Sequence, residues 1–302
     1  MSLVESPLVS VVIPAYNAEN YIAKAINSAL NQSYPNIEII VVNDGSTDNT
    51  ENVLAQFTNN GSVRIVSQSN HGMSGARNTG IRNVRGEFIA FLDSDDYWEP
   101  QKIEKQVDLL QQHLEIGFCS TQTRVETPDG EFINLWSCPS LITSTLCTIF
   151  SQNSAIAGSA SSVLARMTLQ NQVGFFDETL QGLEDTDMWI RYATKAEYCC
   201  IPETLTIVLK RSNSVSRNLD NMFKSAIRMY KKNRLLLENS LQKRFWRSAY
   251  ACMLCDFAKW EARQGRKLAA MSHILLALFI SPFNQGRLCI SLIFAIVTNQ
   301  KF

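Results

Sequence analysis

Apolar and polar positions alternate in a regular way along the first hundred residues. Short apolar or β-branched runs at 8–13, 37–42, 63–66 and 88–92 predict strands. Between these runs, apolar residues recur at helical spacing over 23–30, 53–57, 75–84 and 103–110. The run at 37–42 is apolar throughout, as in a strand that is buried on both faces of a parallel sheet. Repeated strand–helix alternation therefore predicts an α/β fold with a mainly parallel sheet and helices on both faces.

Local signals suggest where some of these helices begin. Asn17 is suited to cap the first helix. Asp48 and Glu51 have the spacing of a capping box for the second helix. Pro100 stands where the first turn of a later helix would tolerate it.

The pattern changes twice further along the chain. Residues 115–217 are less periodic, with an amphipathic stretch near 187–193 and a strand-like run at 205–209. From Asp220 onward the spacing is helical. We therefore expect an α/β domain over residues 1–218 and a helical region over residues 219–302.

Charge follows the same division. The 28 basic and 28 acidic residues cancel, so net charge alone indicates no partner. Residues 220–267, however, contain twelve Lys or Arg against four Asp or Glu. These basic residues lie on predicted helices without interleaved stacking aromatics, so nucleic-acid binding is not expected.

The cysteines and the apolar runs suggest a cellular location. The eight cysteines lack paired zinc-site spacing and the three histidines are scattered, so we expect unpaired buried thiols. The first residues do not resemble a signal peptide. The apolar runs 274–280 and 288–297, separated by Pro282 and Gly286, are too short to span a bilayer. We expect a cytoplasmic protein.

Two acidic sequences follow predicted strands. Asp44 comes after the run 37–42, and Asp93, Asp95 and Asp96 come after the run 88–92. In an open α/β sheet, ligands bind beyond the carboxyl ends of the strands, so these carboxylates should converge on one crevice. Clustered carboxylates repel one another unless a cation compensates, and hard oxygen ligands suit Mg²⁺ or Mn²⁺. The alternatives are that Asp44 only forms a turn and that Asp96 only caps a helix.

Six sequence motifs then occur in order, and together they resemble family 2 glycosyltransferases. They are VSVVIPAYN (9–17), VVNDGSTD (41–48), NHGMSGARN (70–78), GEFIAFLDSDDYW (86–98), VGFFDE (173–178) and GLEDTDMWIR (182–191). The resemblance covers roughly residues 8–217. It implies a GT-A fold, a nucleoside-diphosphate sugar donor, most simply a UDP-sugar, and inverting transfer to an acceptor hydroxyl.

The resemblance also implies roles for particular residues. Those matched to donor nucleotide binding are Pro14, Tyr16, Asp44, Arg77, Asp93 and Ser94. Asp95, with Asp93 near it, matches the metal ligands, and the metal would be Mn²⁺ or Mg²⁺. Asp185 matches the catalytic base, with Glu184 beside it.

Each of these residues also has a purely structural interpretation. Glu184, Asp185 and Asp187 could serve only the dipole of a helix that begins there. Tyr16 and Trp98 could be core aromatics, and Arg77 could be a solvated helix residue. Trp189 fits the apolar face of its predicted helix and is expected in the core.

Departures from the family pattern narrow the function. The Gln-x-x-Arg-Trp motif and the membrane spans of processive polysaccharide synthases are missing, so addition of a single sugar is expected. A histidine that many relatives carry after the strand at 205–209 is also missing, and Lys210 or Arg211 could meet the diphosphate instead. A nucleotidyltransferase and an inactive sugar-nucleotide-binding module remain alternatives.

The C-terminal region suggests a further partner. Its basic excess and two apolar runs suit an interfacial helix on the anionic inner face of the cell membrane. A location on this membrane face would favour a lipid-linked saccharide as the acceptor. The alternative is a helical subdomain that buries its apolar runs.

Overall fold

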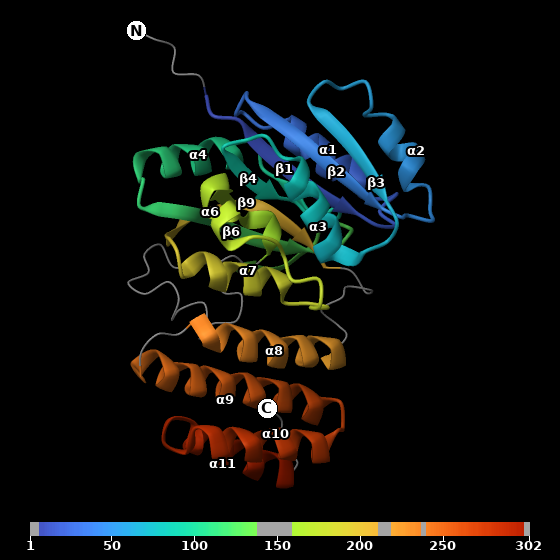
Figure 1. The fold of residues 1–302 in the computed structure, drawn as a ribbon. Coiled ribbons are helices and arrows are strands. Elements are labelled where there is room, and N and C mark those ends of the chain that lie inside the picture. Colours follow the sequence, from blue (N-terminus) through green and yellow to red (C-terminus); the bar gives the residue numbers. More distant parts are fainter. Residues whose placement is uncertain (1–5, 138–158, 211–218, 237–239, 299–302) are drawn as a thin grey trace. The chain divides into compact units, whose positions relative to one another are not determined.

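The computed structural model describes residues 6–137, 159–210, 219–236 and 240–298. The chain divides into two compact units, residues 1–225 and residues 226–302 (Figure 1). The first unit carries a nine-stranded sheet among its described residues, and the second unit is helical. The division falls inside helix α8 (Leu219–Asn233).

The first half of the sheet is parallel, as the apolar runs predict. Its strands are β1 (Val9–Ala15), β2 (Ile37–Asp44), β3 (Val63–Gln68) and β4 (Phe88–Phe91). They lie in the order β3-β2-β1-β4. In the register, Ala15 lies opposite Asn43 and Val12 lies opposite Phe91. The carboxyl ends of β1, β2 and β4 therefore share one edge of the sheet.

The second half makes the sheet mixed rather than mainly parallel. It contains β5 (Tyr97–Trp98), β6 (Ile116–Glu126), β7 (Phe132–Trp136), β8 (Leu164–Arg166) and β9 (Glu197–Leu209). β8 joins β4 antiparallel, and only the β6–β9 pairing in this half is parallel among the described strands. The predicted strand at 205–209 is the end of β9.

Helices cover both faces of the sheet. On one face lie α1 (Ile22–Leu30), α2 (Thr50–Ala55) and α4 (Lys102–Gln112), whose apolar residues join the main core. On the other face, Ala76 of α3 (Gly72–Asn83) packs against Ile40 and Val42. α6 (Met167–Val173) and α7 (Glu184–Ala193) complete the unit.

The aromatic cluster beneath α7 fixes that helix to the sheet. Trp189 is 2% exposed, and its ring packs against Phe91, Phe118 and Phe176. Full burial of each such side chain stabilises the fold by roughly 1.5–3 kcal/mol. Trp189 is thus a core residue, as its helical spacing predicts, and Trp98 is buried as well.

Three of the predicted helix-start signals act differently from expectation. α1 begins at Ile22, so Asn17 lies too early to cap it and instead adopts a φ of 48° in the loop after β1. Asp48 accepts hydrogen bonds from the amide and hydroxyl of Thr50, without a capping box to Glu51. α4 begins at Lys102, so Pro100 lies outside its first turn.

The second unit contains α9 (Ser240–Arg263), α10 (Lys267–Ile280) and α11 (Pro282–Val297), after the end of α8 and a short 3₁₀ turn (Arg234–Leu236). α10 and α11 meet at Ser281, so Pro282 separates the two apolar runs as predicted. Gly286 does not interrupt the helix between the two apolar runs, because it lies inside α11. Among the described helices, none has both the length and the apolar character that a membrane crossing requires.

The cysteines largely follow the prediction of unpaired thiols. Cys119, Cys199, Cys252, Cys255 and Cys289 are free, and the sulfurs of Cys255 and Cys289 lie 3.7 Å apart. Cys200 is disulfide-bonded, which corrects the expectation for that residue.

Candidate active site

The loops after β1 and β2 are bonded to each other at the edge of the sheet where these strands end. Asn17 accepts a 2.8 Å hydrogen bond from the amide of Thr47, and its own amide donates to the Ser46 hydroxyl. The amide of Ala18 donates to the Thr50 hydroxyl at 2.8 Å. Pro14 is buried at the end of β1, whereas Tyr16 is 50% exposed. Tyr16 is therefore not a core aromatic, and its ring is accessible to a ligand.

Asp44 closes β2 and is 2% exposed. Its Oδ1 accepts hydrogen bonds from Gln68 Nε2 at 2.7 Å and from the amide of His71 at 2.8 Å. Among the described residues, Oδ2 accepts none. Asp44 is thus more than a turn residue, because its Oδ1 ties the end of β2 to Gln68 and His71.

The acidic loop after β4 presents two kinds of carboxylate. Asp93, Ser94 and Asp95 are half-buried, and Asp96 is buried. Asp96 accepts hydrogen bonds from the Ser161 hydroxyl at 2.5 Å and from the amide of Leu209 at 3.2 Å. Burial first, and then the charges of Asp95 and Asp93, raise the pKa of Asp96 well above its ordinary value. Asp96 therefore anchors this loop to neighbouring segments and does not cap α4.

Arg77 on α3 connects the acidic loop to α7. It is 2% exposed, which excludes a solvated helix residue. Its Nη2 lies 2.6 Å from Asp93 Oδ1, and its Nη1 lies 2.9 Å from Glu184 Oε1. Burial alone would lower the pKa of Arg77, but the two carboxylates raise it above its ordinary value. Arg77 stays charged and brings the carboxyl end of β4 against the first turn of α7.

Asp185 and Glu184 occupy that first turn with different surroundings. Glu184 is held by Arg77, whereas Asp185 Oδ1 accepts a 2.6 Å hydrogen bond from the amide of Thr186. Burial, reinforced by the charge of Glu184 and opposed by Arg77, raises the pKa of Asp185 to about 6. A carboxylate with a pKa near 6 is matched to accept a proton near neutral pH.

The carboxylates of the loop after β4 suit a hard divalent cation. Asp93 and Asp95 are half-buried carboxylates on one loop, and Mg²⁺ is commonly held by one or two carboxylates plus substrate phosphates. Asp93 Oδ1 is also bonded to Arg77. Within the described part of the chain, no three His, Cys, Asp or Glu side chains form a metal site by themselves. Two carboxylates on one loop fit a divalent cation whose remaining ligands a diphosphate would supply.

Several residues of the site could not be singled out from the sequence. Ser161, Gln68 and Asn78 position other groups through hydrogen bonds that link distant segments. Asn78 lies in the sequence NHGMSGARN, but nothing in the spacing distinguishes it from Arg77. Arg211, considered for the diphosphate, lies outside the described residues.

Comparison with known proteins identifies the class. The model of the family "Glycosyl transferase family 2" matches residues 10–160, which is half of the chain. The chain therefore belongs to this family.

Curated relatives agree with this membership. An uncharacterised glycosyltransferase of Rickettsia typhi is 35% identical over 194 residues, covering 62% of this chain and 59% of the relative. The chondroitin synthase of Escherichia coli is 31% identical over 260 residues, covering 80% of this chain and 36% of that protein. The chain thus spans less than two thirds of the length of these relatives.

Solved structures show the same fold. TarS of S. aureus, residues 1–349 in complex with UDP-GlcNAc, superposes with a TM-score of 0.67 at 19% identity, covering 97% of this chain and 88% of that TarS fragment. The mannosyltransferase PcManGT of Pyrobaculum calidifontis, in complex with GDP-Man and Mn²⁺, has a TM-score of 0.64 at 15% identity, covering 98% and 88%. The predicted GT-A fold is confirmed, and family membership sets aside the nucleotidyltransferase alternative.

Proposed function

We propose that this chain is an inverting glycosyltransferase that moves one sugar from a nucleoside-diphosphate sugar to an acceptor hydroxyl. The observation that carries the proposal is the pairing made by Arg77, which joins Asp93 to Glu184 and so sets Asp185 beside the acidic loop. A metal-binding loop and a carboxylate with a pKa near 6 then belong to one site. The acceptor class is a saccharide or a lipid-linked saccharide, as in the assembly of cell-surface polysaccharide or glycolipid.

The donor is proposed to be a UDP-sugar. An ionised carboxylate only accepts hydrogen bonds, and Asp44 has Oδ2 available for this purpose. The uracil ring offers one N–H donor to such an acceptor, while the exposed ring of Tyr16 can stack on the base. The complex of TarS with UDP-GlcNAc supports this choice, although PcManGT holds GDP-Man.

The proposed mechanism divides the work between two carboxylate sites. Asp95 and Asp93 would hold Mn²⁺ or Mg²⁺, which would supply Lewis-acid stabilisation of the leaving diphosphate. Ser94, between these two residues, would contact the ribose. Asp185 would accept the proton of the attacking hydroxyl on the face opposite the leaving group, and such attack inverts the anomeric centre. Arg77 keeps Glu184 paired, so Glu184 contributes charge and position while Asp185 acts as the base.

A donor panel tests this function. Purified protein with Mn²⁺ or Mg²⁺ is incubated with UDP-, GDP-, CDP- and dTDP-sugars, and release of free nucleoside diphosphate is measured. UDP release that disappears on chelation of the metal is expected. Release from a different nucleotide alone would overturn the choice of donor, and no release from any donor would favour the inactive binding module.

The pH dependence follows from the raised pKa of Asp185. The base must be ionised to accept a proton, so turnover should fall as the pH drops through about 6. Glu184→Gln removes a negative neighbour and leaves the charge of Arg77 uncompensated, and both changes lower the pKa of Asp185. The acid limb of the pH profile of kcat at saturating donor should therefore shift to lower pH in this variant. An unchanged acid limb would mean that a different group controls it.

The second unit is proposed to bind the anionic face of a membrane. Large apolar side chains are exposed along one side of α11, at Phe283, Ile290, Phe294 and Val297. On α10, Leu268 and Phe279 are 90% and 86% exposed. No Asp or Glu follows Glu261 in the sequence, whereas Lys267 and Arg287 lie on these two helices. An exposed apolar surface without acidic residues suits an anionic bilayer interface, and this would place the enzyme at the inner face of the cell membrane.

Co-sedimentation with vesicles tests the membrane proposal. The full chain should pellet with vesicles of anionic phospholipid at low salt and pellet less at high salt. The double variant Phe279→Ser/Phe283→Ser should pellet less, and Leu114→Ser, which changes an exposed leucine outside these helices, should behave like wild type. Equal pelleting of all variants would overturn the proposal, as would a stable dimer that both phenylalanine substitutions dissociate.

A further inference from the structure

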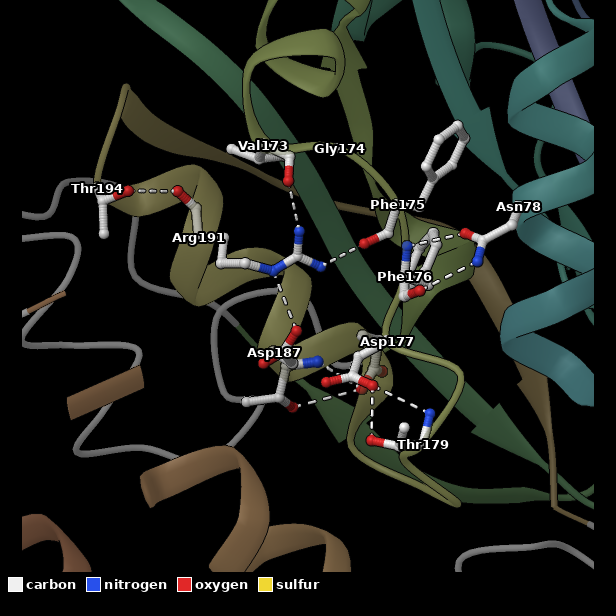
Figure 2. Close-up of polar contacts among 12 residues, drawn as sticks. Asn78, Val173, Gly174, Phe175, Phe176, Asp177, Thr179, Asp187, Arg191 and Thr194 are labelled. Atoms are coloured by element: carbon white, nitrogen blue, oxygen red, sulfur yellow. Dashed lines mark hydrogen bonds and ion pairs between the residues drawn. The ribbon is translucent and has the colours of Figure 1, made fainter. Parts of the chain in front are cut away.

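The segment 173–176, which leads from α6 toward α7, is bonded on two sides (Figure 2). One side is held by Asn78 of α3 and the other by Arg191 of α7. Both side chains bind backbone groups of the segment rather than its side chains. The segment therefore couples the position of α7 to the position of α3.

Asn78 holds the segment with both ends of its amide. Its Oδ1 accepts a 2.8 Å hydrogen bond from the amide of Phe176, and its Nδ2 donates to the carbonyl of Phe176 at 3.0 Å. Nδ2 also donates to Glu178 Oε1 at 2.8 Å. Asn78 is 1% exposed, so removal of its side chain leaves the amide and carbonyl of Phe176 without these buried hydrogen bonds.

Arg191 holds the same segment from α7. Its Nη1 donates to the carbonyl of Val173 at 2.8 Å, and its Nη2 donates to the carbonyl of Phe175 at 2.9 Å. Its Nε donates to Asp187 Oδ2 at 3.0 Å, one turn earlier on the same helix. Asp187 is fully buried, so the planar guanidinium is fixed in direction and uses three of its donors at once.

The two helices joined in this way carry the central groups of the proposed site. α3 supplies Arg77, the neighbour of Asn78, and α7 supplies Glu184 and Asp185 in its first turn. The ring of Phe176 lies under Arg77, 5.4 Å from its guanidinium carbon. The fixed segment therefore touches the residue that pairs with Glu184.

The turn before α7 shows that this helix is held under constraint. Leu183 has a φ of 61°, a left-handed conformation that non-glycine residues rarely adopt, and Gly182 has a φ of 112°. Strained backbone of this kind persists only where the surrounding contacts determine it, and it is common next to active sites. Asn78 and Arg191 bond to the segment that precedes this turn in the chain.

We propose that Asn78 and Arg191 are positioning residues, which set the distance of the α7 first turn from Arg77 and thereby place Asp185 for proton transfer. The proposal rests on the proposed role of Asp185. Neither residue touches donor or acceptor in this account, and both act through the segment 173–176. A shift of about 1 Å in a catalytic group is enough to lower turnover by about a hundredfold.

Kinetics of three variants test the proposal. Asn78→Ala should lower kcat by about 10- to 100-fold while the affinity for UDP, measured by calorimetry, stays within about threefold of wild type. Arg191→Lys keeps the positive charge beside Asp187 but loses the planar guanidinium that bonds to the carbonyls of Val173 and Phe175. We expect kcat to fall less in this variant than in Asn78→Ala. Lys195→Ala is the matched control, because Lys195 is an exposed cation directly after α7.

Hydrogen exchange supplies a readout that does not depend on the chemistry. Asn78→Ala and Arg191→Lys should speed amide exchange at Phe176 and over residues 183–188, and Lys195→Ala should not. Faster exchange with unchanged kcat would overturn the positioning role, as would unchanged exchange over 183–188. If Asn78→Ala does not fold, Arg191→Lys decides the matter. An active Asp185→Asn protein would overturn the assignment of the base. The exchange results would still show whether Asn78 and Arg191 hold α7 in place through the segment 173–176.

Discussion

Asp185→Asn is expected to lower turnover by about 10²–10⁴-fold while the affinity for nucleotide stays near wild type. The amide has nearly the shape of the carboxylate and keeps the acceptor for the amide of Thr186. It cannot take the proton of the acceptor hydroxyl, so the loss should appear in kcat. Steady-state kinetics together with calorimetric titration of UDP measure both quantities.

A distant carboxylate serves as the control for this substitution. Asp108 is exposed on α4, and Asp108→Asn should leave kcat and nucleotide affinity unchanged. If Asp185→Asn instead loses donor affinity and keeps its turnover, Asp185 is a binding residue and the proposed mechanism is wrong.

Asp95→Asn is expected to abolish turnover and to weaken binding of the donor. The proposed mechanism places the metal on Asp95, with Asp93 near it, and Asp93 also pairs with Arg77. Loss of the carboxylate removes a hard, charged oxygen that Mn²⁺ or Mg²⁺ requires. The fold should remain intact because Asp95 is half-buried, whereas Asp96 carries the buried hydrogen bonds of this loop.

Metal titration separates this effect from a folding defect. Donor affinity of the wild-type protein should rise with added Mn²⁺, and that of Asp95→Asn should stay low at every concentration. Thermal unfolding without metal should give similar midpoints for the two proteins. Full activity of Asp95→Asn in buffer with a chelator would show that Asp95 does not hold a catalytic metal.

Much of the first unit could be predicted because its strands are apolar and β-branched and its helices are amphipathic. Val41 and Val42 lie in a strand buried on both faces, and a continuous apolar run reports that environment directly. The antiparallel half could not be predicted in the same way. β8 is three residues long, and its pairing with β4 and β6 depends on contacts between segments distant in sequence.

The site shows the same division between local and long-range information. Asp44, Asp93 and Asp95 follow strands, so their place at one edge of the sheet follows from topology. The pairing of Arg77 with Glu184 spans 107 residues, and no local pattern encodes it. Asn17 illustrates the converse case, since a polar residue before a helix suggests a cap, yet its side chain bonds to Thr47 on another loop.

The stereochemistry of the released sugar tests the central claim most directly. The protein is incubated with an α-linked UDP-sugar and Mn²⁺ without an acceptor, so that water takes the place of the hydroxyl. Proton NMR then identifies the first anomer formed before mutarotation. Attack from the face opposite the diphosphate predicts release of UDP together with the β-anomer. First appearance of the α-anomer would contradict an inverting transfer assisted by Asp185.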